Sequence, residues 1–340
     1  MRATWITALM AAVLAATPWA VYGKSFTVAS DGSGDFKTLQ EAIAAAPANS
    51  PEIVEIHIRP GTYAGPFIIP KDKPHLRLIG DAAATTKLLW DRNVNDPKPP
   101  GTDGFNPGML VRADDFQATG LTIENTSGDH GQALALRIDG DRAVMTDCRM
   151  LGWQDTLMVN NGRDYFRNCT IAGRVDFIYV SATAVFDHCE IHSRNGGHIT
   201  AASTPQDQPF GFVFLNCKLT GDALAWDPAT TNPATTRKAK VTPQADLGRP
   251  WRAYGSVTYV NCEMEAHIKP EGWNNWGKAE NEKTARYAEY HSTGPGAAPD
   301  KRVAWARQLT DREAAEFTPA RILAGRDGWN PEAAAATRSQ

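Results

Sequence analysis

Residues 145–191 contain one short pattern three times: Met145-Thr-Asp-Cys148-Arg-Met150, Phe166-Arg-Asn-Cys169-Thr-Ile171 and Phe186-Asp-His-Cys189-Glu-Ile191. Each copy has a large apolar residue three positions before a cysteine and another apolar residue two positions after it. The cysteines follow one another after 21 and 20 residues. A fixed period of this length is typical of a solenoid, in which each repeat forms one coil.

The pattern returns around two later cysteines, after wider gaps of 28 and 45 residues, as Phe214-Leu-Asn-Cys217-Lys-Leu219 and Tyr259-Val-Asn-Cys262-Glu-Met264. Short alternating segments separated by Gly, Asn and Asp favour strands over helices. We therefore predict an all-β fold, a parallel β-helix. The wider gaps are expected to hold long loops on one face, where they form a substrate cleft.

The five cysteines are expected to point into the coil as a ladder of small apolar side chains. Their spacing leaves two states open. Every thiol is free, or one bridge joins neighbouring coils, as Cys148–Cys169 or Cys169–Cys189. Single stacked cysteines lack the Cys-x-x-Cys geometry of zinc sites, so no metal is expected there.

Residues 1–23 have the features of a signal peptide: a basic start at Arg2, an apolar run from Trp5 to Ala16 and, before Lys24, the small or tolerated residues Val21-Tyr22-Gly23. The run is shorter than the ~20 residues of a membrane-spanning helix. We expect cleavage before residue 24, a single domain over 24–332, a disordered tail over 333–340, and a secreted protein, periplasmic or extracellular. A net charge of −3 argues against nucleic-acid or anionic-membrane binding.

The ends of the chain and one internal segment depart from the repeat. Residues 38–46 have helical spacing, with Asp35 or Thr38 as the cap and Pro47 after the end, so we predict a short helix that covers the first coil. Residues 203–244 are polar and rich in Pro and Thr, which indicates a loop excursion. A second short helix is predicted over 311–317.

The repeat also predicts which polar residues share a face. Asp155 follows Cys148 by seven residues, and Asp176 follows Cys169 by seven. The two carboxyl groups are therefore expected on adjacent coils, ~4.8 Å apart by strand spacing. Like charges at that range push two pKa values apart, which provides one acid and one nucleophile from the same residue type.

Other polar and aromatic residues fit a catalytic role near this pair. Gln154 adjoins Asp155, and Gln132 lies about one coil earlier; both amides are able to donate hydrogen bonds to an oxyanion. Arg249 is a candidate for a bidentate pair with Asp176. Three aromatic side chains offer flat surfaces for sugar rings: Trp153, Tyr179 and Trp251.

Structural explanations compete with these roles. Asp at a β-helix corner is commonly a turn residue, and Trp273 and Trp276 are expected to be packing residues. The chain has no His-Glu-x-x-His or Gly-x-Ser-x-Gly motif, which leaves metal catalysis and a serine nucleophile without support.

Segments from 26 to 329 together resemble the pectinesterase family, carbohydrate esterases with a right-handed parallel β-helix. The motifs that carry the resemblance include Asp31-Gly-Ser-Gly-Asp35, Pro60-Gly-Thr-Tyr63, Gly131-Gln-Ala-Leu134, Gln154-Asp-Thr-Leu157, Asp176-Phe-Ile-Tyr179, Leu247-Gly-Arg-Pro-Trp251 and Gly294-Pro-Gly296. Two positions depart from the family's pattern: Gly65 replaces an acidic residue, and Val180 replaces a glycine, next to Tyr179 in place of a phenylalanine.

The resemblance implies a pectin methylesterase that acts as a monomer on methylated homogalacturonan without a metal or organic cofactor. It implies that Asp176 is the nucleophile, Asp155 the general acid and then base, and Arg249 the residue that orients the nucleophile. Gln132 and Gln154 would be the oxyanion donors, and Trp251 would contact the sugar.

Four rival functions remain open from the sequence. Two close carboxylates also suit a retaining glycosidase, and the β-helix also suits a lyase acting on pectate. An esterase or thioesterase of this fold acting on another substrate is a third candidate. A noncatalytic polysaccharide-binding protein is the fourth, but it leaves the paired aspartates unexplained.

Overall fold

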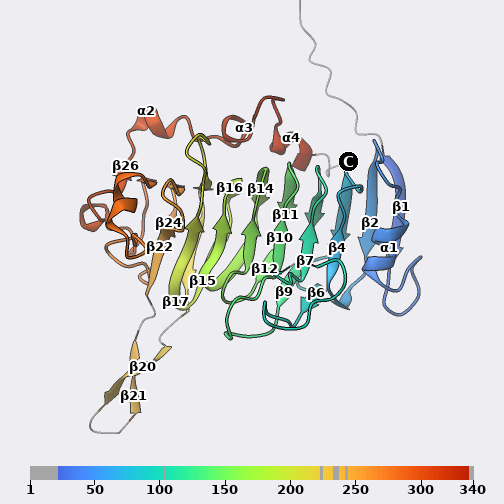
Figure 1. The fold of residues 1–340 in the computed structure, drawn as a ribbon, viewed down its shortest axis with the longest axis horizontal. Helices are drawn as coiled ribbons and strands as arrows, with labels where there is room; N and C mark the ends of the chain where they lie inside the picture. Colours follow the sequence, from blue (N-terminus) through green and yellow to red (C-terminus); the bar gives the residue numbers. More distant parts are fainter. Residues whose placement is uncertain (1–21, 103, 223–224, 233–236, 242–243, 337–340) are drawn as a thin grey trace, which may run out of the picture.

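The structure is a computed structural model that describes residues 22–102, 104–222, 225–232, 237–241 and 244–336 of the 340 residues. The predicted signal peptide lies outside this part of the chain except for its last two residues; strand β1 begins at Tyr22. The chain winds into coils stacked along one axis, so strands of successive coils lie side by side (Figure 1). All the strand pairs between coils are parallel, which confirms the predicted parallel β-helix.

One sheet forms the first face of the coil and takes one strand from each turn. Its strands are, in order, β1 (Tyr22–Val28), β2 (Ile53–Ile58), β5 (Leu76–Gly80), β8 (Gln117–Thr119), β11 (Ala143–Thr146), β14 (Arg163–Arg167), β16 (Thr183–Asp187), β18 (Phe212–Leu215), β23 (Ser256–Val260), β25 (Arg286–Tyr290) and β26 (Arg307–Gln308).

The second sheet forms the other two faces, because two long strands, β15 (Thr170–Val180) and β17 (Glu190–Ala202), bend from one face onto the next. The row on one side contains β3 (Gly61–Ala64), β6 (Thr86–Trp90), β9 (Thr122–Asn125), β12 (Arg149–Leu151), β19 (Lys218–Gly221) and β24 (Glu263–Met264). The row on the other side contains β4 (Phe67–Ile69), β7 (Met109–Val111), β10 (Leu136–Ile138), β13 (Leu157–Val159) and β22 (Ala245–Pro250).

The residue before each repeat cysteine makes the corner between the first sheet and the second. The φ angles of these five residues lie between 52° and 54°, in the left-handed region: Asp147, Asn168, His188, Asn216 and Asn261. Asn, Asp and His tolerate this conformation better than most residues do. The corner therefore explains why the repeat has one of these residue types immediately before its cysteine.

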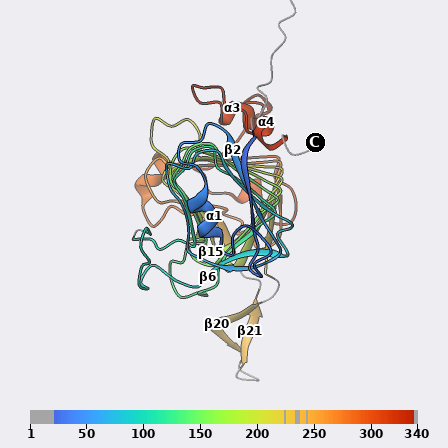
Figure 2. The ribbon, with the colours of Figure 1, turned by 90° about the vertical axis from the view of Figure 1, so that its right-hand side faces the viewer.

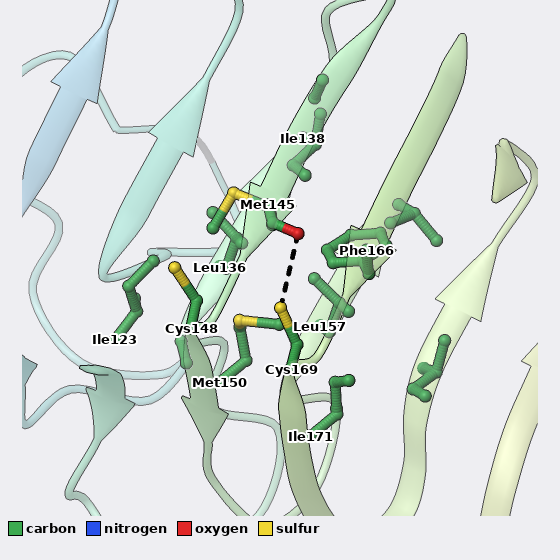
Figure 3. Packing of buried hydrophobic residues seen from close by; sticks show 14 of the residues in the cluster. Ile123, Leu136, Ile138, Met145, Cys148, Met150, Leu157, Phe166, Cys169 and Ile171 are labelled. Carbon is green, nitrogen blue, oxygen red and sulfur yellow. Dashed lines mark hydrogen bonds between the residues drawn. The ribbon is translucent and has the colours of Figure 1, made fainter. Parts of the chain in front are cut away.

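The cysteines point into the core as predicted, and all five are free and at most 2% exposed. The thiol of Cys169 donates to the carbonyl oxygen of Met145 on the previous coil at 3.5 Å (Figure 3). Cys217 makes the equivalent bond to Phe186 at 3.2 Å. Burial raises the pKa of the Cys148 thiol well above its usual value. The ladder is therefore one of buried thiols that lie within hydrogen-bonding distance of backbone carbonyls.

The large apolar residues of the repeat form a second ladder inside the coil. The rings of Phe166 and Phe186, of Phe186 and Phe214, and of Phe214 and Tyr259 stack with centroids 4.8, 4.6 and 4.4 Å apart. Buried apolar residues of all three faces join this core. The apolar position of the repeat thus supplies one core layer per coil.

Helix α1 (Leu39–Ala45) packs against the first coil, where it covers the open end in the axial view (Figure 2). Thr38, and not Asp35, is its N-cap, and Glu41 completes a capping box. Its buried residues Leu39 and Ile43 belong to the same core as the coil strands.

The C-terminal segment runs back along the outside of the first sheet (Figure 1). It contains α2 (Asp311–Ala314), α3 (Pro319–Ile322) and α4 (Pro331–Ala336), with the short 3-10 helices η1 (Ala279–Lys283) and η2 (Pro299–Lys301) earlier in the chain. Helix α2 is three residues shorter than predicted, and α4 includes the first residues of the predicted tail; residues 337–340 lie outside the described part. Ile322 and Leu323 pack against Val144 and Tyr165 of the first sheet.

The polar excursion carries an antiparallel hairpin that projects from the solenoid, β20 (Ala225–Asn232) and β21 (Arg237–Val241) (Figure 1). The sequence indicated only a loop there. Among the described residues, no helix is long and apolar enough to cross a bilayer.

Candidate active site

Asp155 and Asp176 lie at the corner that precedes β13 and the second half of β15. Leu157 pairs with Ile178, and each aspartate lies two residues before its member of that pair. Both aspartates are in the left-handed region, with φ of 62° and 53°. The structure therefore brings the two carboxyl groups to adjacent coils at the same phase, where strand spacing is ~4.8 Å.

The carboxyl group of Asp155 is buried, with the residue 4% exposed. Burial raises its pKa, the hydrogen bond from Gln132 lowers it, and the charge of Asp176 raises it again, with a result of about 7. Nε2 of Gln132 donates to Oδ2 of Asp155 at 2.7 Å. Near neutral pH this group is able both to give and to take a proton.

Asp176 has a different environment, because Arg249 binds it through two hydrogen bonds. Nε of Arg249 donates to Oδ1 at 2.9 Å, and Nη2 donates to Oδ2 at 2.7 Å. Arg249 lies on β22, where it pairs with Ala201 of β17. A bidentate guanidinium favours the ionised carboxylate. One aspartate is therefore bound by a guanidinium beside another that is able to carry a proton.

The two glutamines lie on adjacent coils next to this pair. Gln132 and Gln154 form a parallel bridge, and the amide of Ala133 donates to the carbonyl of Gln154 at 3.1 Å. The Gln154 side chain also hydrogen-bonds to Asp155 and lowers its pKa. Both amide groups thus lie beside the carboxyl group of Asp155.

The three candidate aromatic residues lie at two different positions. Tyr179 and Trp251 lie together with ring centroids 6.4 Å apart, in an apolar cluster with Leu134 and Met158. Tyr179 is 4% exposed, so most of its ring is covered by protein, whereas Trp251 is partly exposed. Trp153 lies outside that cluster, with Cζ of Arg194 5.3 Å from its ring centroid.

No group of three His, Cys, Asp or Glu side chains within the described residues is arranged to hold a metal ion. The chemistry that the site offers is that of two carboxyl groups, two amides and a guanidinium. Groups of these types are able to act as a nucleophile, as a proton donor and as hydrogen-bond donors to a developing negative charge.

The sequence profile of the Pectinesterase family matches residues 25–326. Pectinesterase 31 of Arabidopsis thaliana is 37% identical over 299 residues, which are 85% of this chain and 89% of the plant protein. The chain belongs to the pectinesterase family. Its members are carboxylic-ester hydrolases, so this chain is one as well.

Solved structures of the family agree with this fold. The pectin methylesterase from carrot superposes with a TM-score of 0.80 at 33% identity and covers 92% of this chain and 96% of its own. A pectin methylesterase in complex with a hexasaccharide superposes with a TM-score of 0.73 at 30% identity, with 92% and 98% covered. The right-handed parallel β-helix implied by the pectinesterase motifs is confirmed.

The two tryptophans that were expected to pack have different positions. Trp273 is 3% exposed and lies in the core between Tyr259 and Tyr287, with centroids 5.8 and 4.5 Å away. Trp276 lies instead at the site, where Cζ of Arg249 is 3.9 Å from its ring centroid. Sequence reasoning missed this contact because Trp276 belongs to a loop without a repeat phase.

Both departures from the pectinesterase pattern lie at constrained backbone positions. Val180 has φ of 88°, which is unusual for a β-branched residue, and it packs in the apolar cluster with Tyr179. At Gly65 a Cβ would come within 3.1 Å of the carbonyl oxygen of Gly108. The chain therefore has little room for an acidic side chain where the family usually has one.

Proposed function

We propose that the chain is a pectin methylesterase that hydrolyses the C6 methyl ester of galacturonate units in pectin and releases methanol and pectate. The observation that carries the proposal is the contrast within the aspartate pair. Arg249 holds Asp176 through two hydrogen bonds, and Asp155 beside it has a pKa of about 7. Ester hydrolysis through a covalent intermediate needs one carboxylate that attacks and one carboxyl that moves a proton.

In the first step, an oxygen of Asp176 attacks the ester carbonyl carbon, and the carbonyl electron pair moves onto its oxygen. Amide N–H groups of Gln132 and Gln154 stabilise this oxyanion. When the tetrahedral intermediate collapses, the bond to the methoxy oxygen breaks, and the Asp155 proton goes to that oxygen. Methanol leaves, and Asp176 is joined to the uronate as an anhydride.

In the second step, Asp155 is a carboxylate and takes a proton from a water molecule. The water oxygen attacks the uronate carbonyl carbon of the anhydride, and the same two glutamines stabilise the oxyanion. The bond to the Asp176 oxygen then breaks. Asp176 returns to Arg249 as a carboxylate, Asp155 is protonated again, and the product leaves as a uronic acid, which loses its proton to the solvent and becomes the uronate.

The surroundings of the pair support a polysaccharide substrate. Trp251 and the apolar cluster beside it suit a sugar ring, and a relative of the same fold has been solved with a hexasaccharide. We further infer that residues 1–23 are an export signal, and that the mature chain acts as a monomer outside the cytoplasm, where pectin is present.

Methanol release from highly methylated pectin tests the proposal. We expect Asp176→Ala and Asp155→Ala to reduce kcat at least ~10³-fold, since each removes a group that takes part in bond making or breaking. The exposed Asp207 provides the control, and Asp207→Ala should retain full activity. Near-normal methanol release by Asp176→Ala would contradict the mechanism.

The products separate the rival functions. Methanol without new reducing ends excludes a glycosidase, and the absence of unsaturated products excludes a lyase. Binding of pectin without methanol release would indicate a noncatalytic protein. If pectin is untouched while another methyl ester or an acyl thioester is hydrolysed in an Asp176-dependent way, the mechanism holds and the substrate assignment fails.

A further inference from the structure

An ion pair joins the strand that carries Asp176 to the loop that leads into Gln132. Nη1 of Arg174 lies 2.5 Å from Oδ2 of Asp129. Arg174 comes two residues before Asp176 on β15, and Asp129 comes three residues before Gln132. The pair therefore connects the coil of the nucleophile to the segment that positions an oxyanion donor.

The Arg174 end of this connection is fixed by backbone contacts. The amide of Arg174 donates to the carbonyl oxygen of Trp153 at 2.8 Å. On the other side, Gly197 has φ of 99°, and a Cβ there would lie 2.1 Å from the Arg174 carbonyl oxygen. The backbones of the neighbouring coils thus hold Arg174 from both sides.

The Asp129 end belongs to an exposed loop with few contacts. Gly128 and Gly131 both have positive φ, 84° and 101°, and Asp129 and His130 are exposed. Within the described structure, the bond to Arg174 is the one hydrogen bond or ion pair made by residues 128–131. Gln132 follows directly and is itself exposed, so its side chain is held by the hydrogen bond to Asp155 and not by packing.

We propose that Arg174 and Asp129 are a positioning pair that holds Gln132 in the geometry needed to donate to the oxyanion. The inference rests on the proposed function. Neither residue touches the reacting atoms; the pair acts by restricting the loop. An ion pair with side chains 38% and 30% exposed contributes little to global stability. Small displacements of a catalytic donor, by contrast, have large effects on rate.

The test compares Arg174→Ala in two backgrounds. In the otherwise unchanged chain we expect kcat for methanol release to fall about threefold to fivefold, in the range of coupling measured for exposed ion pairs. KM and the melting temperature should change little. In the Gln132→Ala background, Arg174→Ala should have no further effect on kcat, because the group that the pair positions is absent. An equal loss in both backgrounds would overturn the proposal.

Substitution of Asp129 distinguishes a positioning effect on kcat from an effect of net charge. Asp129→Ala should lower kcat as much as Arg174→Ala, and the double variant should be no worse than either single one. If the double variant instead regains full kcat, the singles act through net charge near an anionic substrate, and the positioning role is wrong. Additive losses would contradict it as well.

A matched control is the exposed pair of Arg307 on β26 and Glu313 on α2, with side chains 63% and 38% exposed. Arg307→Ala should leave kcat unchanged. Failure of the inference is distinguishable from failure of the proposed function. If Gln132→Ala lowers kcat and Arg174→Ala does not, only the positioning pair fails. If Gln132→Ala has no effect, the oxyanion assignment itself is wrong.

Discussion

The guanidinium of Arg249 lies over the ring of Trp276, with Cζ 3.9 Å from the ring centroid. The same guanidinium makes both hydrogen bonds to Asp176. Asp176 and Trp276 therefore both restrict Arg249, one by hydrogen bonds and one by cation–π contact. The orientation of the proposed nucleophile depends in this way on a residue of a distant loop.

We expect Trp276→Leu to lower kcat about tenfold, because Arg249 loses the surface that fixes its plane, a contact worth about 1–2 kcal/mol. Steady-state methanol release provides the measurement. Trp329→Leu is the matched control, since Cζ of Arg163 lies 5.5 Å from the ring centroid of Trp329, which belongs to the C-terminal segment and packs against the first sheet. The control should lower the melting temperature and leave kcat intact. Equal kcat values for the two variants would contradict the role of Trp276.

The pH dependence should report Asp155, whose pKa is raised to about 7 chiefly by burial. In the proposed mechanism, the acyl-enzyme forms only when Asp155 carries a proton for methanol. We therefore expect kcat/KM to fall about tenfold per pH unit above about 7. In Asp155→Asn, any residual kcat/KM should lose this decline. A decline that survives in the variant would belong to another group.

The raised pKa of Asp155 also affects stability. The folded state keeps the proton up to about pH 7, whereas the unfolded chain loses it near the usual value of 3.8. Between these pH values the folded state binds more protons, so the contribution of Asp155 to stability declines as pH rises. We expect Asp155→Asn to raise the melting temperature at pH 7 more than at pH 4. An equal shift at both pH values would contradict this.

The positive φ of Val180 predicts an unusual order of stability among variants at this position. Val180→Ala loses apolar contact and keeps the strained φ of 88°. Val180→Gly loses the same contact but relieves strain of about 1–2 kcal/mol. We expect the glycine variant to be at least as stable in denaturant unfolding as the alanine variant. Val185, fully buried in β16, is the control, where alanine should be clearly more stable than glycine.

Thiol titration checks the cysteine ladder. All five cysteines are free and buried. We expect a thiol reagent to modify none of them in the folded protein and all five after unfolding without a reductant. Titration of three thiols in the unfolded chain would reveal one bridge between neighbouring coils.

The repeat of 20 and 21 residues was sufficient to predict the fold and the aspartate pair. Each coil has nearly the same length in this region, so equal distances from Cys148 and Cys169 lead to the same place on the coil. The residue type before each cysteine also had a physical cause, the left-handed corner. Because the backbone is periodic, the places of Asp155 and Asp176 on the coil are predictable from the sequence.

Contacts made by loops were not predictable in this way. Trp276 reaches Arg249, and Asp129 reaches Arg174, from segments whose length has no relation to the period. The hairpin of β20 and β21 was also missed, since its pairing is local and unrelated to the coils. Burial of Tyr179 depends on neighbours from other coils, such as Met158 and Ala201, which no local pattern reveals.

The ladder of peptide hydrogen bonds between β13 and β15 has a consequence for how this scaffold changes over time. It sets the separation of Asp155 and Asp176, because each stands two residues before a paired position. Every amino acid except proline carries both groups that form such a ladder. Substitutions elsewhere therefore change stability or substrate preference without changing the separation of the two aspartates. A different reaction on this scaffold would require replacement of Asp155 and Asp176, the residues at the corner.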